Sequence, residues 1–259
     1  MTLRFSTIAR SEVGLVRDGN EDSALVSNCV IAVADGMGGH AGGEVASAIA
    51  ITTLAGLVEV LEDSAIDPQS REDLLMNISF SIDTEIENEV KKNPNLTGMG
   101  TTLTALHLGE ESVELLHIGD SRCYQWDGKK LKQLSYDHTV MQELIDQGRL
   151  TLDEVANHPQ RSMLTQALMG DGQIDPVLTV FPTKVGYRYL LCSDGLTNVI
   201  SDHEMAQLLK RNSGSEIIDA LMDAVHAKGA PDNITIFLAE VVDDGQSVDR
   251  MLLGAAKVE

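Results

Sequence analysis

Four short apolar runs in the sequence each carry an aspartate at one end, and this pattern limits the possible folds more than any other feature. Three runs end in Asp35-Gly36, Gly119-Asp120 and Ser193-Asp194, and the fourth begins after Asp232-Asn233. These runs, residues 30–34, 115–118, 189–192 and 234–239, are apolar enough to be central strands of a sheet. If their ends meet, the four carboxylates repel one another unless some are protonated or a cation neutralises them.

The aspartates indicate either a metal site or a set of surface turns. Carboxylates, backbone carbonyls and water are the ligands that Mg²⁺ and Mn²⁺ prefer, and the sequence has no cluster of histidine and cysteine typical of zinc. The chain also has six Asp-Gly pairs, and Asp-Gly is a favoured turn dipeptide. The pattern alone leaves both interpretations open.

The hydrophobic periodicity predicts an α+β protein. Residues 44–62, 70–92, 202–210 and 216–228 have the pattern of helices. Short apolar runs predict strands at residues 23–26, 30–34, 102–108, 112–118, 122–126, 129–134, 177–181, 187–192 and 233–242. Helices that alternate with meandering strands favour sheets covered by helices. Residues 243–259 fit either an ordered cap or the start of a linker.

The composition excludes several classes of protein. Forty acidic and nineteen basic residues give a formal charge of −21, which repels a phosphate backbone, so we expect no nucleic-acid partner. No apolar run approaches the roughly 20 residues that span a bilayer, and residues 1–10 lack the pattern of a signal peptide. The odd number of cysteines argues against a disulfide framework. We therefore expect a reduced, cytoplasmic monomer without a membrane segment.

Two further motifs resemble a calcium-binding loop and a dinucleotide-binding loop, but each lacks a required residue. Residues 18–22 imitate the start of an EF-hand calcium loop, but Ser23 and Cys29 stand where glycine and glutamate are needed. Gly36, Gly38 and Ala41 fit the dinucleotide pattern G-x-G-x-x-A, which also needs an acidic residue at the end of a second strand about 20 positions on. The chain continues there as a helix, so a nucleotide-dependent oxidoreductase is not expected.

Six segments, taken in order, resemble the bacterial metal-dependent serine/threonine protein phosphatases of type 2C, the PPM family. They are residues 14–22 (GLVRDGNED), 34–40 (ADGMGGH), 98–102 (GMGTT), 117–122 (HIGDSR), 191–196 (LCSDGL) and 231–235 (PDNIT). Residues 158–162 (HPQRS) are most similar to actinobacterial-type members. The resemblance implies a four-layer αββα sandwich, with two mostly antiparallel sheets flanked by helix pairs. It also implies a catalytic domain over residues 1–242, with a flap at about 137–170, and a tail or linker start at 243–259.

Carried over residue by residue, the resemblance implies a metal cluster. Asp35 would bridge two Mn²⁺ or Mg²⁺ ions, the Gly36 carbonyl would bind one of them, and Asp194 and Asp232 would complete the pair. Asp120 would hold a third, weaker ion that it shares with Asp194.

Other site residues follow from the same resemblance. Ser162 of the flap would help at the third ion, and Asn233 would support the ligands from behind. Glu21 and Asp22 match acidic positions near the metals, although many bacterial members have glutamine at the position of Glu21.

Two residues are candidates for direct work on the substrate. Arg17 matches the arginine that holds the phosphate, and its alternative role is a surface salt bridge with Asp18 or Asp22. His40 is the nearest imidazole that could protonate the leaving oxygen, and its alternative is a loop histidine among flexible glycines.

The implied reaction is the hydrolysis of phosphoserine and phosphothreonine in proteins. A hydroxide that bridges two metal ions would attack phosphorus in line with the leaving oxygen. The implied partners are phosphorylated proteins, among them bacterial Ser/Thr kinases and their substrates. The alternative is a catalytically silent module that binds phosphoproteins on the same fold. Such a module usually lacks one or more ligands, whereas all four aspartates are present here.

Overall fold

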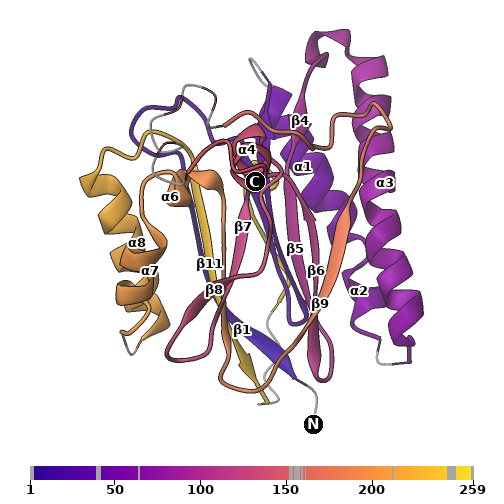
Figure 1. Cartoon of the computed structure of the whole chain (residues 1–259). Helices are drawn as coiled ribbons and strands as arrows, with labels where there is room; N and C mark the ends of the chain where they lie inside the picture. The colour runs from indigo at the N-terminus through magenta and orange to yellow at the C-terminus, as the bar shows by residue number, and fades with distance from the viewer. Residues whose placement is uncertain are drawn as a thin grey trace.

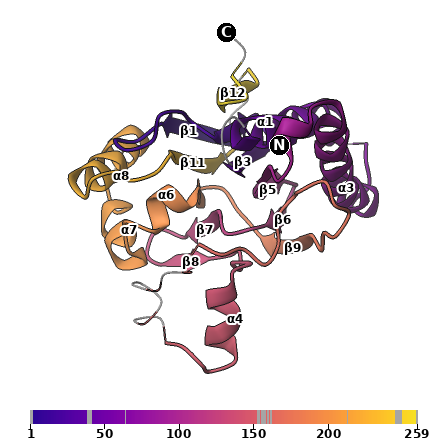
Figure 2. The ribbon, with the colours of Figure 1, turned by 90° about the horizontal axis from the view of Figure 1, so that it is seen from above.

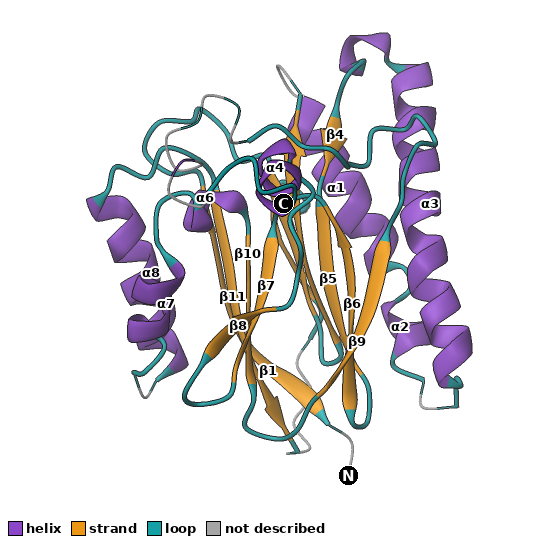
Figure 3. Cartoon of the chain, in the orientation of Figure 1, coloured by secondary structure: helices purple, strands orange, loops and turns teal. Residues whose placement is uncertain are grey.

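Two antiparallel sheets form the centre of the molecule (Figures 1 and 3). The computed structural model describes residues 3–38, 42–63, 65–151, 154, 158, 160, 162–211, 213–243 and 249–257. Within them, one sheet has five strands, in the order β1 (Arg4–Glu12), β11 (Ile234–Val242), β10 (Arg188–Cys192), β7 (Arg122–Trp126) and β8 (Leu131–Gln133). The second sheet has the order β12 (Met251–Gly254), β2 (Asp22–Val26), β3 (Val30–Met37), β5 (Leu103–Leu108), β6 (Ser112–Ile118) and β9 (Val177–Pro182), and β4 (Gly100–Thr101) pairs with β3.

Helices cover the outer face of each sheet and give the molecule four layers (Figure 2). The second sheet is covered by α1 (Gly42–Ala55), α2 (Val58–Leu61) and α3 (Pro68–Lys92). The five-stranded sheet is covered by α6 (Asp194–Thr197), α7 (Asp202–Leu208) and α8 (Gly214–Ala227). The 3₁₀ helix η1 (Pro94–Leu96) follows α3, and α4 (Val140–Asp146) lies outside the four layers. The expected αββα sandwich is confirmed.

Three apolar layers hold these elements together. The layer between the sheets is built on large side chains such as Phe5, Tyr189 and Phe237, all fully buried. Phe5 and Tyr189 meet edge to face with ring centroids 6.1 Å apart, which is a favourable geometry for aromatic pairs. A further apolar cluster lies between each of the two sheets and the helices that cover it. Most of the buried strands are therefore apolar on both faces.

The sequence explains where the helices begin and which face they bury. The carboxylate of Asp67 accepts the N–H of Ser70 at 3.0 Å, and Pro68 occupies the first helical position, so α3 starts with a capped end. Along α3, buried Leu75, Ile78, Ile82 and Ile86 recur at three- and four-residue spacing.

The structure differs from the expected elements in several places, and strand β1 was not expected at all. The helix expected over residues 44–62 is broken between α1 and α2, where Gly56 lies in a turn; glycine is a poor helix residue. The strand expected at 102–108 is β5, which begins at Leu103, and β4 is a separate short strand just before it. In the region expected as a cap or linker, residues 251–254 form β12 and pair antiparallel with β2.

No helix among residues 3–38, 42–63, 65–151, 162–211, 213–243 and 249–257 has the length and apolar character needed to cross a membrane.

Candidate metal and phosphate site

A cavity of about 480 Å³ opens where β3, β10 and β11 bring their aspartates to the same end of the sandwich. Nine of the residues expected at the site line this cavity: Arg17, Glu21, Asp35, Gly36, Asp120, Ser162, Asp194, Asp232 and Asn233. Among the described residues, Met37, Gly38, Thr102 and Leu164 also line it. Asp22 is fully buried and does not line the cavity, and His40 lies outside the described residues. The aspartates therefore converge and are not scattered surface turns.

Close backbone contacts allow the aspartate-bearing segments to converge. Asp194 begins α6, and a Cβ added to the next residue, Gly195, would lie 1.9 Å from the carbonyl oxygen of Asn233. A Cβ on Gly36 would lie 2.1 Å from the carbonyl oxygen of Gly43 in α1. Only glycine fits at either place, which explains why Asp35 and Asp194 are each followed by glycine.

The convergence of carboxylates changes their acidity. Burial, together with the charges of Asp22 and Asp194, raises the pKa of Asp35 well above its ordinary value. Burial and the charges of Asp194 and Asp137 raise the pKa of Asp120 to about 8. Burial and the charge of Asp232 raise the pKa of Asp194. A cation in this cavity would relieve the repulsion that these shifts reflect.

The donor set fits an oxygen-preferring divalent cation. The cavity combines four aspartates with the backbone of Gly36, and none of the described residues that line it is histidine or cysteine. In the part of the chain that the structure describes, no three acidic, histidine or cysteine side chains are already drawn together as a coordination group. The oxygen-rich lining therefore suits Mg²⁺ or Mn²⁺ better than zinc.

Arg17 lies at the rim of the cavity. Its Nη2 donates to Oδ2 of Asp232 at 2.8 Å, and 49% of its side chain is exposed. This hydrogen bond raises the pKa of the guanidinium, which remains charged. The alternative of a salt bridge between Arg17 and Asp18 or Asp22 was wrong, because Arg17 pairs with Asp232. The contact holds a cation next to the aspartates, where a phosphate could reach it.

The sequence model of the family described as protein phosphatase 2C matches residues 18–239. This chain belongs to the protein phosphatase 2C family. The serine/threonine protein phosphatase PstP of Mycobacterium tuberculosis is 40% identical over 259 residues, which cover 99% of this chain and 49% of that protein. The serine/threonine phosphatase stp of Listeria monocytogenes is 34% identical over 238 residues, covering 89% of this chain and 94% of that protein. This chain thus spans about half the length of PstP.

A solved structure agrees with this assignment. The catalytic domain of PstP in complex with two manganese ions has a TM-score of 0.84 and 39% sequence identity, covering 93% of this chain and 100% of that one.

In this member of the protein phosphatase 2C family, Asn233 holds the loop that carries Arg17 and Glu21. Its Oδ1 accepts the backbone N–H of Glu21 at 2.8 Å. Its Nδ2 donates to the carbonyl oxygens of Val13 and Gly19, at 2.9 and 2.8 Å. Asn233 thus joins both ends of this loop to the start of β11.

Asp22 joins the two sheets behind the cavity. The hydroxyl of Ser193, next to Asp194, donates to its Oδ2 at 2.8 Å, and its Oδ1 has no hydrogen-bond partner among the described residues. Burial raises the pKa of Asp22 to about 7. Asp22 therefore adds negative charge immediately behind the cavity aspartates when it is ionised.

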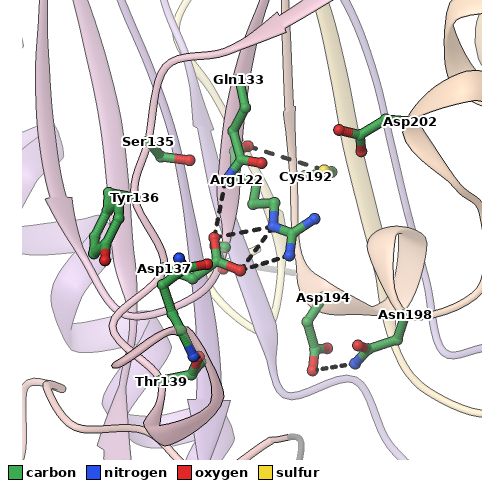
Figure 4. Close-up of polar contacts among 12 residues, drawn as sticks. Arg122, Gln133, Ser135, Tyr136, Asp137, Thr139, Cys192, Asp194, Asn198 and Asp202 are labelled. Carbon is green, nitrogen blue, oxygen red and sulfur yellow. Dashed lines mark hydrogen bonds and ion pairs between the residues drawn. The ribbon is translucent and has the colours of Figure 1, made fainter. Parts of the chain in front are cut away.

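Several supporting residues were not expected from the sequence. Asn198, one helical turn after Asp194, donates its Nδ2 to Oδ2 of that aspartate at 2.8 Å (Figure 4). The hydroxyl of Thr102 accepts the backbone N–H of Asp35 at 3.0 Å. The four-residue spacing of Asp194 and Asn198 was a detectable signal, because such pairs are neighbours on a helix. Thr102 and Asp35 are 67 positions apart and gave no local signal.

The expected flap is fixed at its base. Arg122 of β7 donates from Nε and Nη2 to Asp137, with a shortest distance of 2.6 Å, and Gln133 donates to the same carboxylate (Figure 4). At the other end of the flap, Leu168 exchanges backbone hydrogen bonds with Thr101 of β4. Only part of the segment between these anchors is described.

Proposed function

We propose that this chain hydrolyses phosphoserine and phosphothreonine in proteins with the help of divalent metal ions. The observation that carries the proposal is the convergence of four aspartates on one cavity with a half-exposed arginine at its rim. The family, and relatives named as serine/threonine protein phosphatases, support the same conclusion.

Asp35, the Gly36 carbonyl, Asp194 and Asp232 would hold two Mn²⁺ or Mg²⁺ ions. When bound, such a pair supplies an activated water and neutralises charge on the phosphate. The solved PstP catalytic domain with two manganese ions supports this assignment. Glu21 lines the same cavity and would adjust its charge.

The chain's own residues would bind and orient the phosphate. Arg17 has a planar guanidinium that can donate two parallel hydrogen bonds to phosphate oxygens. Its bond to Asp232 fixes the guanidinium next to the carboxylates. Asn198 keeps one oxygen of Asp194 in place, so the other oxygen can face a cation.

A third, weaker ion would lie at Asp120, shared with Asp194 and approached by Ser162 of the flap. All three residues line the cavity. We expect Asp120→Ala to leave two ions bound and to lower turnover. Metal stoichiometry and phosphopeptide hydrolysis, measured on one preparation, test this. Loss of all bound metal in the variant, or unchanged turnover, would contradict a separate third site.

The biological role follows from this activity. We propose that the protein acts as a cytoplasmic monomer on phosphorylated proteins, including Ser/Thr kinases and their substrates. Its catalytic domain would cover residues 1–242. This chain spans about half the length of PstP. The binding partners of the whole protein are therefore proposed together with its activity.

The direct test is phosphate release from a phosphothreonine peptide with Mn²⁺ and with a chelator. We expect release with Mn²⁺ and none after complete chelation. A silent phosphoprotein-binding module would bind the peptide under both conditions and release no phosphate, which would overturn the proposed activity.

A further inference from the structure

A second cavity, of about 230 Å³, lies between the edge strands β8 and β9, at the far end of the sandwich from the aspartates. Its lining includes Gln125, Lys132, Phe181, Thr183, Lys184 and Tyr187, which we call the lysine groove. Strand β10 begins at Arg188, directly after Tyr187, and leads toward Asp194 at its other end. At about 3.3 Å per residue, the seven steps from Tyr187 to Asp194 separate the two cavities by roughly 20 Å. Seen from above, β8 and β9 both lie on the side of the sandwich that faces α4 (Figure 2).

Two lysines of the groove are held in place by aromatic rings. The Nζ of Lys132, on β8, lies 5.7 Å from the ring centroid of Phe181, on β9. The Nζ of Lys184 lies 4.9 Å from the ring centroid of Tyr187. Both rings pack against the apolar layer between the sheets. A ring face positions an ammonium group but does not neutralise it, so both cations can still bind an anion.

Three uncharged polar side chains in and beneath the groove already have hydrogen-bond partners within the protein. Gln125 donates to the hydroxyl of Tyr189 at 3.1 Å, and that hydroxyl donates to Thr183 at 2.7 Å. Since these polar groups are engaged, the two ammonium groups are the charged features that remain available in the groove.

Ion pairing distinguishes the lysines around the groove from three other lysines that the structure describes. Lys129 and Lys130 lie in the turn that joins β7 to β8, close to Lys132. Among the described residues, no ion pair within 4.0 Å joins any of these three, or Lys184, to a carboxylate, whereas Lys91, Lys92 and Lys228 are each paired.

Two carboxylates near these lysines have hydrogen bonds of their own, although the pKa of Asp127 is lowered by backbone hydrogen bonds from Lys130 and Lys129 and also by the charge of Lys129. Asp127 accepts the backbone N–H groups of Lys129 and Lys130, both at 2.8 Å, and Glu240 pairs with Arg188 at 2.8 Å. Two of the nine lysines of the chain therefore line the groove and two more lie in the turn before β8, on a protein of net charge −21.

We propose that the lysine groove binds an acidic, extended peptide segment of a partner protein. Beyond the groove, the surface as a whole is negative and repels a polyanion. Charges further away than about 8 Å are screened at physiological ionic strength, so a short segment in the groove experiences mainly Lys132 and Lys184. A nucleic acid or an anionic membrane is a larger polyanion that extends beyond the groove, so the charge distribution favours a short acidic segment.

The open sides of the groove suit an extended chain. In the described residues β8 pairs only with β7, and β9 only with β6, so each strand has a free edge. A free edge can donate and accept main-chain hydrogen bonds with an added strand. This inference does not depend on the proposed activity, because the groove is separate from the aspartate cavity.

The test measures binding of a fluorescein-labelled glutamate-rich peptide by fluorescence anisotropy at physiological ionic strength. The variant Lys132→Glu/Lys184→Glu is compared with Lys210→Glu/Arg211→Glu, which changes the charge equally on exposed residues near the end of α7. We expect the groove variant to bind at least about tenfold more weakly, and the control variant to bind like the unchanged protein. If the glutamate variant fails to fold, as judged by its melting temperature, Lys132→Gln/Lys184→Gln takes its place.

Three outcomes would overturn the proposal. The first is an unchanged protein that does not bind the peptide. The second is equal loss of binding in both variants, which would indicate a general charge effect. The third is equal or tighter binding of a glutamine counterpart peptide, a DNA oligonucleotide or an anionic vesicle.

Discussion

Together with burial, the charge of Asp194 raises the pKa values of three neighbouring aspartates, Asp22, Asp35 and Asp120. Asp194 borders the cavity, receives a hydrogen bond from Asn198, and its pKa is raised by burial and by Asp232. We expect Asp194→Asn to lower turnover by about a hundredfold or more, because an amide is a poor metal ligand. The metal-free variant should melt at the same temperature as the unchanged protein, or higher, since one repelling charge is gone.

Kinetics with a phosphopeptide and thermal unfolding in chelator measure both effects of this substitution. Asp171→Asn is the matched control, because it removes one charge from another Asp-Gly pair that does not line the cavity. Normal turnover of Asp194→Asn would show that Asp194-Gly195 is only a turn.

Arg17 allows a second test at a single residue. Loss of a charge-assisted hydrogen bond costs about 1.5–3 kcal/mol, so Arg17→Ala should lower kcat/KM roughly 10- to 100-fold. Arg17→Lys should recover only part of this, since an ammonium cannot donate two parallel bonds. The control is Arg10→Ala, which removes an exposed arginine on β1. Equal kcat/KM in Arg17→Ala and Arg10→Ala would exclude a phosphate-binding role for Arg17.

The sequence could identify residues with a local pattern but not their distant partners. Asp35, Asp120, Asp194 and Asp232 were detectable because each borders an apolar run. The bond between Ser193 and Asp22 joins residues 171 positions apart, and no periodicity indicates such a contact. Contacts of this kind depend on the order of strands in the sheets.

Among the elements, α3 has a specific role in holding the end of the flap. Buried Asp83 accepts three backbone N–H groups at and just after the end of the expected flap, those of Met169, Gly170 and Gly172, at 3.1, 2.7 and 2.9 Å. We expect Asp83→Ala to lower the free energy of unfolding by about 2–4 kcal/mol, because it leaves these donors unsatisfied.

Denaturant unfolding and amide hydrogen exchange of residues 168–172 check this anchor. Asp73→Ala, an exposed change on the same helix, is the control and should have little effect. Exchange in residues 168–172 that is equally slow in both variants would contradict an anchoring role for Asp83.

Helices and strands were predictable where buried side chains recur with a clear period. They were less predictable where backbone conformation or long-range pairing sets their bounds. β6 and β7 have the predicted bounds, because strong apolar character stops at polar turns. The break between α1 and α2 was not predicted, since residues on both sides of Gly56 remain apolar. The pairing of β12 with β2 is long-range, and local composition could not distinguish it from a linker.

At the scale of the whole molecule, clustered carboxylates make the stability of the metal-free protein depend on pH. The pKa of Asp22 is raised to about 7 and that of Asp120 to about 8, against about 3.9 in an unfolded chain. The folded state therefore binds more protons than the unfolded state between these values, and stability falls as pH rises. Buried His117, with its pKa lowered to about 3, has the opposite effect below about pH 6.5.

We accordingly expect the melting temperature of the metal-free protein to fall from about pH 6.5 to about pH 8. Saturating Mn²⁺ should remove most of this decrease, because the cation replaces the protons. Thermal unfolding at both pH values, with chelator and with Mn²⁺, provides the measurement. A metal-free melting temperature that is constant or rises over this range would contradict the electrostatic description of the cavity.

The four-layer arrangement itself could be expected only through the family resemblance. Periodicity predicted helices and strands, and thus an α+β class, but it does not specify which strands are neighbours. The pairing of β1 with β11, and of β10 with both β11 and β7, joins distant parts of the chain. The resemblance implied two sheets flanked by helix pairs, and the order of the strands comes from the structure.

The central claim is that the aspartate cavity becomes a phosphatase site when divalent ions bind. The most direct measurement is a Mn²⁺ titration of the metal-free protein that records bound metal by calorimetry and phosphate release from a phosphothreonine peptide on the same preparation. We expect no release without metal, and turnover that rises only as two ions are bound per chain. Full turnover in the metal-free protein, or complete metal binding without any phosphate release, would contradict the claim.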